Sequence, residues 1–281
     1  MKLAVFGHPV SHSLSPEIHR SFAAQFGLDL QYDAIDAAPE SFPDALGAFA
    51  KAGATGCNIT LPLKTLAWEA AGRSSDEADR ARAANTLVFE SFSNWFADNT
   101  DGRGLVRDLK RLLPGGPADR RILLLGAGGA AAGVLGPLLQ AGATAVHIAN
   151  RTPERARSLA EHHADLGTVR WSGLAEALSP DEAPAAPYDL VIQSTSAGHA
   201  GKGPQLTPDL FAPGALCYDL NYGAASSALA RWCADHEVMH ADGLGMLVEQ
   251  AGLSFALWTG HTPDCRTVLK ALRSKVGTPG S

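Results

Sequence analysis

Hydrophobic residues occur along the chain in short runs that alternate with longer segments of helical periodicity. In the first hundred residues, amphipathic segments at 16–26 and 41–52, and around 76–83, predict helices. Between them, short apolar runs predict strands at 3–7, 31–35, 56–60, 86–90 and 95–97. This alternation is typical of a sheet flanked by helices.

A second alternating series follows Pro114-Gly115-Gly116-Pro117, which ends a helical pattern that begins at Asp101. Between residues 121 and 241, apolar runs predict strands at Ile122, Val146, Val169, Leu190 and Leu216. These runs are typical of a doubly wound nucleotide-binding domain. The last two apolar segments, 244–259 and 266–275, predict helices without strands of their own, so we expect them to pack on the first domain.

The strand at Ile122 leads into the turn Gly126-Ala127-Gly128-Gly129-Ala130 and then into a helix. Gly126 permits a tight turn, and Gly128 has no side chain to keep the backbone from a pyrophosphate. The small Ala131 lets the helix pack close to the strand. Because a helix N-terminus offers N–H groups and the positive end of its dipole, the turn predicts a dinucleotide site.

The next strand ends in Asn150-Arg151-Thr152, without the acid that would hold a ribose 2′-hydroxyl. Arg151, and Arg155 one helical turn later, offer planar donor forks that suit a 2′-phosphate. The alternative is a pair of solvated arginines at a helix start, where positive charge is unfavourable without an anion. The phosphate interpretation predicts NADP as the cofactor.

Charge and composition narrow the classes of function. A net charge of −6 disfavours nucleic-acid binding. No apolar run reaches 18 residues and no basic-then-apolar leader is present, so we expect no membrane association and a cytoplasmic location. The four widely spaced cysteines predict neither a disulfide framework nor a zinc site, and His8, His12 and His19 lack nearby carboxylates or thiols to complete a metal site. A small-molecule substrate is the expected partner. The sequence is compatible with a homodimer.

With 281 residues the chain is long enough for two domains. We predict an α/β protein with a discontinuous, N-terminal substrate-binding and catalytic domain, 1–101 with 242–281, and a Rossmann-type doubly wound NADP-binding domain, 102–241. The active site is expected in the cleft between them.

Ser13 and Ser15 lie in the run Ser13-Leu14-Ser15-Pro16. A proline such as Pro16 suits the first position of a helix. Their hydroxyls are therefore expected where an anion such as a carboxylate meets a helix N-terminus. Ordinary N-capping is the alternative, and one serine suffices for it.

Further polar residues follow predicted strands. Asn58 and Thr60 alternate and point to one side, and Lys64 follows a proline in a rigid turn. Asn85 adds an amide, and Asp101 offers a candidate acid. A lysine and an aspartate that meet across a hydroxyl group could transfer a proton; the alternatives are a surface lysine and a helix cap.

The order of these motifs resembles the shikimate dehydrogenase family over nearly the whole chain. The resemblance is carried by Gly7-His8-Pro9-Val10-Ser11-His12-Ser13-Leu14-Ser15-Pro16, Asn58-Ile59-Thr60-Leu61-Pro62-Leu63-Lys64, Ala84-Asn85-Thr86, Asp98-Asn99-Thr100-Asp101-Gly102, the glycine turn, Asn150-Arg151-Thr152 and Asp242-Gly243-Leu244-Gly245-Met246-Leu247-Val248-Glu249-Gln250-Ala251.

The resemblance implies an NADP-dependent enzyme that interconverts 3-dehydroshikimate and shikimate in chorismate and aromatic amino-acid biosynthesis. It implies that Lys64 and Asp101 are the catalytic pair. Substrate contacts are implied for Ser13, Ser15, Asn58, Thr60, Asn85, Tyr222 and Gln250, besides the catalytic pair. Cofactor contacts are expected at Gly126, Ala127, Gly128, Gly129, Ala130, Asn150, Arg151, Thr152, Arg155, Thr195 and Gly243.

The chain departs from the family pattern at three places. Gln193 begins Gln193-Ser194-Thr195-Ser196 where Asn-Ala-Thr-Ser is usual, Ala84 replaces a valine, and Asn221-Tyr222 replaces a more aromatic pair. Two other functions stay open. One is an NAD-dependent quinate or dual quinate/shikimate dehydrogenase, whose substrate carries an extra hydroxyl beside the carboxylate. The other is a module that binds NADPH as a sensor without catalysis, which the intact Lys64 and Asp101 disfavour.

Overall fold

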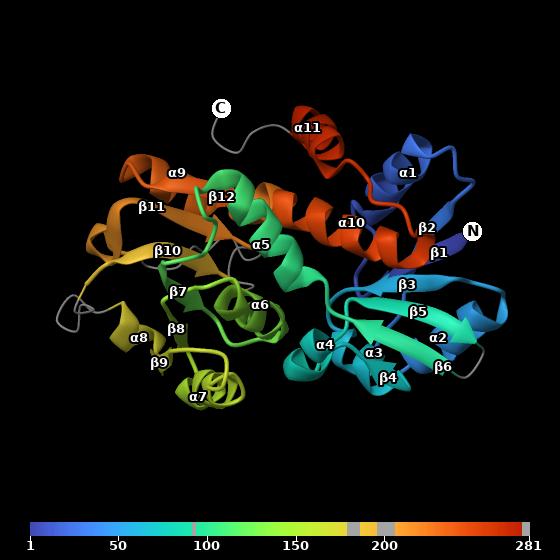
Figure 1. Cartoon of the computed structure of the whole chain (residues 1–281), viewed down its shortest axis with the longest axis horizontal. Helices are drawn as coiled ribbons and strands as arrows, with labels where there is room; N and C mark the ends of the chain where they lie inside the picture. The colour runs from blue at the N-terminus through green and yellow to red at the C-terminus, as the bar shows by residue number, and fades with distance from the viewer. Residues whose placement is uncertain (92–93, 179–185, 196–205, 277–281) are drawn as a thin grey trace. The chain divides into compact units, whose positions relative to one another are not determined.

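The computed structural model describes residues 1–91, 94–178, 186–195 and 206–276 (Figure 1). The chain divides into two compact units. The first comprises residues 1–104 and 248–271, and the second comprises 105–247 and 272–281. Two helices, α5 (Asp101–Leu112) and α10 (Leu244–Thr259), contribute residues to both units, as does α11 (Cys265–Val276).

The first unit contains a mixed six-stranded sheet in the order β2-β1-β3-β5-β6-β4. β1 runs parallel to β2 and β3, whereas β5 runs antiparallel to β3 and β6. Its strands are β1 (Lys2–Gly7), β2 (Gln31–Asp36), β3 (Gly56–Ile59), β4 (Arg73–Ser74), β5 (Thr86–Ser91) and β6 (Asn94–Asp98). Its helices also include α1 (Ser15–Gln25), α2 (Phe42–Lys51), α3 (Lys64–Glu69) and α4 (Asp76–Ala81).

Alternate residues of β1 face opposite sides of this sheet, as the two-residue period of a strand requires. Ala4 and Phe6 pack with α2 and α3, whereas Leu3 and Val5 pack with Tyr32 and other residues on the opposite face. The predicted strands and helices of this region are present, with ends that differ by a few residues. The sequence did not predict α3 or the two-residue β4.

The second unit contains a six-stranded sheet in the order β12-β11-β10-β7-β8-β9, and all its strands run parallel. The strands are β7 (Arg121–Leu125), β8 (Ala145–Asn150), β9 (Val169–Gly173), β10 (Tyr188–Gln193), β11 (Phe211–Asp219) and β12 (Met239–Asp242). The helices include α6 (Gly129–Gln140), α7 (Pro153–Glu161), α8 (Leu174–Ala177) and α9 (Ser227–Asp235), with short 3₁₀ turns at Pro208–Leu210 and Gly223–Ser226. The predicted doubly wound fold is confirmed.

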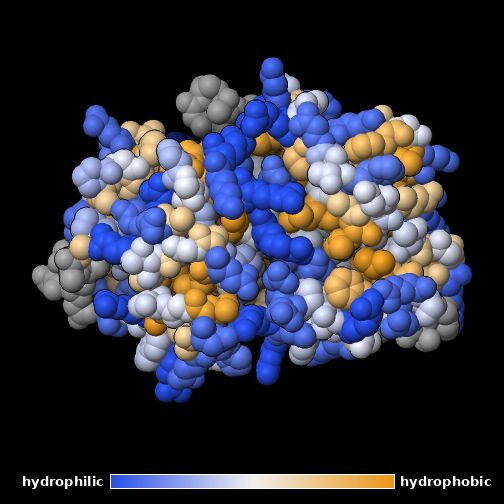
Figure 2. Space-filling view, in the orientation of Figure 1, coloured by the Kyte–Doolittle hydropathy of each residue, from blue (hydrophilic) through white to orange (hydrophobic). Residues whose placement is uncertain are grey.

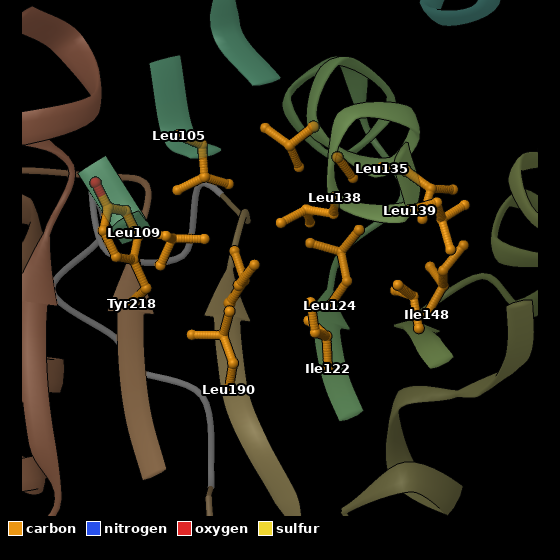
Figure 3. Close-up of a cluster of buried hydrophobic side chains, with 14 of the residues drawn as sticks. Leu105, Leu109, Ile122, Leu124, Leu135, Leu138, Leu139, Ile148, Leu190 and Tyr218 are labelled. Carbon is orange, nitrogen blue, oxygen red and sulfur yellow. The ribbon is translucent and has the colours of Figure 1, made fainter. Parts of the chain in front are cut away.

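A continuous apolar cluster covers one face of this parallel sheet (Figure 3). Ile122 and Leu124 of β7 meet leucines from α5 and α6, and Ile148 and Leu190 extend the cluster along neighbouring strands. On the other face, Leu123 and Leu125 pack with residues of α8 and α9. Burial on both faces explains why β7 reads as an unbroken hydrophobic run in the sequence.

The face of the molecule seen in Figure 2 is mostly hydrophilic, and hydrophobic residues on it form separate patches. Within the described ranges, none of the helices is long and apolar enough to cross a bilayer.

Candidate active site

Lys64 and Asp101 form a close ion pair in the first unit. Lys64 is the first residue of α3 and Asp101 the first residue of α5, and Lys64 Nζ lies 2.5 Å from Asp101 Oδ2. The two side chains are only 16% and 9% exposed. Ion pairs that are largely shielded from water hold their geometry more firmly than surface pairs. The structure therefore brings together the two residues that the sequence analysis named as the proton-transfer pair.

Asn85 connects this pair to the helix α10. Its amide Nδ2 donates to Asp101 Oδ1 at 2.7 Å, to Thr100 Oγ1 at 2.9 Å and to Gln250 Oε1 at 3.0 Å. Its Oδ1 accepts from the Thr100 backbone N–H at 2.9 Å. Since the Asn85 side chain is almost fully buried, these bonds fix the Asp101 carboxylate from the side opposite to Lys64.

The polar cluster continues beyond Asn85 toward Asn58 of β3. Asn58 Nδ2 donates to the backbone oxygen of Asn85 at 3.1 Å and to Ser254 Oγ at 3.1 Å. Thr86 Oγ1 lies 2.7 Å from Ser254 Oγ and donates to Asn85 Oδ1 at 2.9 Å. Four of the predicted substrate residues, Asn58, Asn85, Asp101 and Gln250, thus belong to one buried hydrogen-bond network.

Gly104 of α5 permits the close approach of α10 that this network needs. A β-carbon at position 104 would lie 2.7 Å from the backbone nitrogen of Gln250, closer than non-bonded atoms approach each other. The small residue therefore lets Gln250 come within reach of Asn85, and any side chain at this position would push the two helices apart.

The predicted anion site at the start of α1 has one buried and one half-buried serine. Ser15 is the first residue of α1 and is 6% exposed, whereas Ser13 is half-buried. Ser13 Oγ accepts the Ser15 backbone N–H at 3.2 Å, but the N-cap residue of α1 is Leu14, whose side chain makes no capping hydrogen bond. Thr60, directly after β3, is half-buried and lies with its methyl group close to Gly7.

Four polar residues of the network, Tyr32, Thr86, Thr100 and Ser254, were not among the predicted site residues. Thr86 and Thr100 lie in motifs that the sequence analysis quoted, next to Asn85 and Asp101. Ser254 lies four residues after Gln250 on α10, which places both on the same side of the helix. Tyr32 carries no comparable signal, because a tyrosine in a strand is ordinary.

In the second unit, the glycine turn has the shape that the sequence predicted. Gly126 has a φ of +112°, and a β-carbon there would lie 2.6 Å from Ser194 Oγ. Gly128 is the N-cap of α6, and β-carbons at Gly128 and Gly129 would meet no described residue within 4 Å. Among the described residues nothing covers the helix start, whose first N–H groups can face an incoming ligand.

Polar residues lie at the end of β8 and directly after it. Asn150 Nδ2 donates to the backbone oxygen of Thr152 at 2.9 Å and shapes the turn into α7. Arg151 and Arg155 are exposed, and Arg155 lies in the first turn of α7. Their side chains are free of the core and can reach an anion at this end of β8.

Gln193, one of the departures from the family pattern, is buried and forms a hydrogen bond with the loop after β10. Its Oε1 accepts the Thr195 backbone N–H at 3.2 Å, and the Thr195 backbone oxygen accepts from Asn221 at 3.1 Å. Gly243 N–H donates to the Asn221 backbone oxygen at 2.9 Å. Tyr222 is half-buried next to this contact, and burial raises the pKa of its hydroxyl. Thr195 and Gly243 are therefore both bonded to Asn221, which directly precedes Tyr222 in the second unit.

Comparison with known families agrees with this geometry. Residues 5–87 match the shikimate dehydrogenase substrate binding domain, residues 110–201 match the shikimate / quinate 5-dehydrogenase family, and residues 243–273 match the shikimate 5'-dehydrogenase C-terminal domain. A curated relative from Methylococcus capsulatus, named shikimate dehydrogenase (NADP(+)), is 46% identical over 98% of this chain and 96% of its own length. The chain belongs to the shikimate dehydrogenase family. The resemblance seen in the sequence is thus confirmed.

Solved structures of the family share the fold of the whole chain. The structure of an Ael1 enzyme from Pseudomonas putida is 40% identical, with a TM-score of 0.88 and coverage of 100% of this chain and 99% of that one. Shikimate 5-dehydrogenase from Thermus thermophilus, solved in complex with NADP(H) and shikimate, is 33% identical with a TM-score of 0.83. That match covers 98% of this chain and 99% of the Thermus chain.

Proposed function

We propose that this chain is an NADP-dependent shikimate dehydrogenase, which reversibly reduces 3-dehydroshikimate to shikimate in aromatic amino-acid biosynthesis. The observation that carries the proposal is the shielded Lys64–Asp101 pair, held by Asn85, in a chain 46% identical to a relative of that name. The shikimate and NADP(H) in the Thermus complex support the same substrate and cofactor.

The residues of the first unit suit a polyhydroxylated ring acid. Gln250, Asn85 and Asn58 offer amide donors and acceptors for ring hydroxyls, and Asp101 offers a carboxylate acceptor. Ser13 and Ser15 hydroxyls at the start of α1 would bind the substrate carboxylate. Thr60 and Tyr222 complete the set of substrate contacts that we propose.

The hydrogen-bond donors of the second unit suit NADP. The turn at Gly128 and Gly129, which no described residue covers, would hold the pyrophosphate together with the neighbouring Gly126, Ala127 and Ala130. The exposed arginines would hold the 2′-phosphate, with Asn150 and Thr152 shaping their loop and Thr195 and Gly243 reaching the nicotinamide end. When bound, NADPH supplies the hydride that reduces the carbonyl carbon.

Lys64 supplies the proton for the reduction. Its ammonium N–H donates to the carbonyl oxygen as negative charge develops there, and the lysine is left as a neutral amine. Asp101 accepts a hydrogen bond from the ammonium and fixes its direction, while Asn85 holds Asp101 in place. Because the Lys64 side chain retains 16% exposure, water can return the proton to the amine.

The domain bounds from the sequence, 1–101 with 242–281 and 102–241, are part of this proposal.

A cytoplasmic location is also part of the proposal, because all four cysteines are free thiols and are buried. Free thiols suit a reducing compartment.

The test is the initial rate of NADP⁺ reduction by the purified chain with shikimate. We expect turnover with shikimate and NADP⁺ that exceeds turnover with quinate or with NAD⁺ by at least about tenfold, as one charge-assisted contact provides. A faster rate with quinate and NAD⁺ would favour the quinate dehydrogenase. Binding of NADPH without any turnover of 3-dehydroshikimate would favour the sensor.

A further inference from the structure

Two stacked aromatic side chains lie beside the polar cluster of the first unit. His19 of α1 and Tyr32 of β2 are both fully buried, and their ring centroids are 4.4 Å apart with an interplanar angle of 7°. Phe22 and Trp258 pack around the His19 ring at 5.9 and 5.5 Å. Such a stack leaves the Tyr32 ring little freedom to move, so the position of its hydroxyl is well defined.

The Tyr32 hydroxyl donates to Asn58 Oδ1 at 2.7 Å. The other end of the Asn58 amide faces the backbone oxygen of Asn85, which can only accept. The Asn58 NH₂ must therefore point toward Asn85, and Oδ1 must point toward a donor. Tyr32 supplies that donor and thereby fixes which way the amide is turned.

Burial raises the pKa of the Tyr32 hydroxyl, so the phenol keeps its proton at neutral pH and can act as the donor. The phenol therefore holds Asn58, a residue that the proposed function assigns to the substrate.

His19 contributes to this arrangement through its ring rather than through a hydrogen bond. Neither of its ring nitrogens has a hydrogen-bond partner among the described residues. Burial lowers the pKa of His19 to about 3, so the imidazole is neutral at the pH of the cell. A neutral flat ring can stack on Tyr32 without placing a charge in the core.

We propose that Tyr32 is a positioning residue for the substrate, whose hydroxyl holds Asn58 in the orientation that binds shikimate. The inference rests on the proposed function, because it concerns how that substrate is held. Without the Tyr32 hydroxyl, Asn58 Oδ1 loses the donor that fixes it, and the amide can leave the orientation in which it meets a ring hydroxyl.

The test is Tyr32→Phe, which removes the hydroxyl and keeps the stacked ring. A buried amide oxygen that is left without its donor lowers the affinity of the site for its ligand by roughly tenfold. We therefore expect the KM for shikimate to rise about tenfold, with kcat within threefold and the KM for NADP⁺ unchanged. The split between KM and kcat arises because Lys64 and Asp101 do not contact Tyr32, and a general loss of stability would not produce it.

Tyr188→Phe is the matched control. Tyr188 is also buried, and its hydroxyl lies 2.5 Å from His147 Nδ1 in the second unit. The control therefore loses a buried tyrosine hydroxyl of the same kind, and we expect its KM for shikimate to stay within twofold of wild type.

A double substitution shows whether Tyr32 acts through Asn58. In an Asn58→Ala background, Tyr32→Phe should raise the KM for shikimate by clearly less than it does alone, because the amide that it releases is already absent. Full additivity of the two effects would overturn the route through Asn58.

The wild-type assay separates this inference from the proposed function. A wild-type chain that does not turn over shikimate with NADP⁺ would overturn the proposed function and this inference together. An active wild type with a folded Tyr32→Phe variant whose KM for shikimate stays within twofold would overturn the inference alone.

Discussion

The first unit buries the amides and the carboxylate of its candidate site, whereas the second unit keeps its two candidate phosphate-binding arginines at the surface over an apolar core. Asn85 and Asp101 are 1% and 6% exposed, while Arg151 and Arg155 are exposed. The buried polar groups satisfy one another before any ligand binds. The arginines, in contrast, gain a buried partner only when an anion arrives.

This difference has a physical consequence for how each half responds to change. A buried hydrogen-bond network is part of the fold, so loss of one member affects stability and function together. Substitution of a surface residue leaves the apolar core around Leu124 and Leu138 intact, so it changes ligand affinity and has little effect on stability. Substrate recognition in the first unit is therefore coupled to folding, and cofactor preference in the second is separable from it.

The largest expected effect is on turnover, from Lys64→Ala. Removing a general acid typically lowers kcat by about 10²–10⁴-fold. The KM for shikimate should change little, because Asn85 and Gln250 remain bonded to each other. Stability should also fall, since Asp101 loses the cation beside its carboxylate. Steady-state kinetics and thermal unfolding measure both effects.

Two matched variants sharpen this result. Lys64→Arg keeps the positive charge but replaces the ammonium by a group that gives up its proton far less readily, so it should restore stability and not turnover. Lys270→Ala removes an exposed lysine of α11 and should leave both unchanged. Turnover of Lys64→Ala within a few-fold of wild type would refute the assignment of Lys64 as proton donor.

The apolar part of this architecture was the easier part to predict from the sequence. The run from Ile122 to Leu125 is buried on both faces of a parallel sheet, so every residue is apolar and the strand is unmistakable. β12, Met239–Asp242, was missed because it is short and half of its residues are polar. The helix α3 was missed because the sequence analysis placed its first residue, Lys64, in a rigid turn after Pro62.

The polar network was only partly predictable, because its bonds join distant parts of the chain. The Asn85–Gln250 bond spans 165 positions, and the Asn58–Ser254 bond spans 196. Strand alternation placed Asn58 on a face of the sheet, but no local pattern pairs it with a particular helix. Tyr32 could not have been found in this way, because its role depends on which residue its hydroxyl meets after folding.

A smaller effect is expected on cofactor preference, from Arg151→Ala and Arg155→Ala. Each should lower the ratio of kcat/KM with NADP⁺ to kcat/KM with NAD⁺ by about tenfold, as loss of one charge-assisted bond implies. The free energy of unfolding should stay within about 0.5 kcal/mol of wild type, because both side chains are exposed.

Arg157→Ala provides the control for these two variants. Arg157 is exposed on the same helix and pairs with Glu161 at 3.7 Å, so its loss should not change cofactor preference. If Arg151→Ala and Arg155→Ala left the preference intact, the phosphate interpretation of both arginines would be wrong. A marked loss of stability in either variant would instead contradict the separation of cofactor binding from folding.

The expected effect that is smallest at neutral pH is a pH dependence of stability that comes from His19 in the first unit. Burial lowers the pKa of His19 to about 3, below its ordinary value of 6.5. Between these two values the unfolded chain binds a proton that the folded chain does not, so stability is lost as pH falls from about 6.5 toward 3. The slope from one such group is about 1.4 kcal/mol per pH unit, and above pH 6.5 the residue has no effect.

His19→Phe tests this slope, because phenylalanine keeps a flat ring against Tyr32 and cannot titrate. Urea unfolding of wild type and variant at several pH values between 7.5 and 4.5 should give free energies whose difference changes by about 1.4 kcal/mol per pH unit only below pH 6.5. Taking the difference removes the contribution of His147 and His240, whose pKa values burial also lowers in the second unit. The exposed His12 serves as the control, and His12→Phe should leave the slope unchanged. Parallel pH profiles for wild type and His19→Phe would show that His19 is protonated in the folded chain, which the packed stack on Tyr32 does not allow.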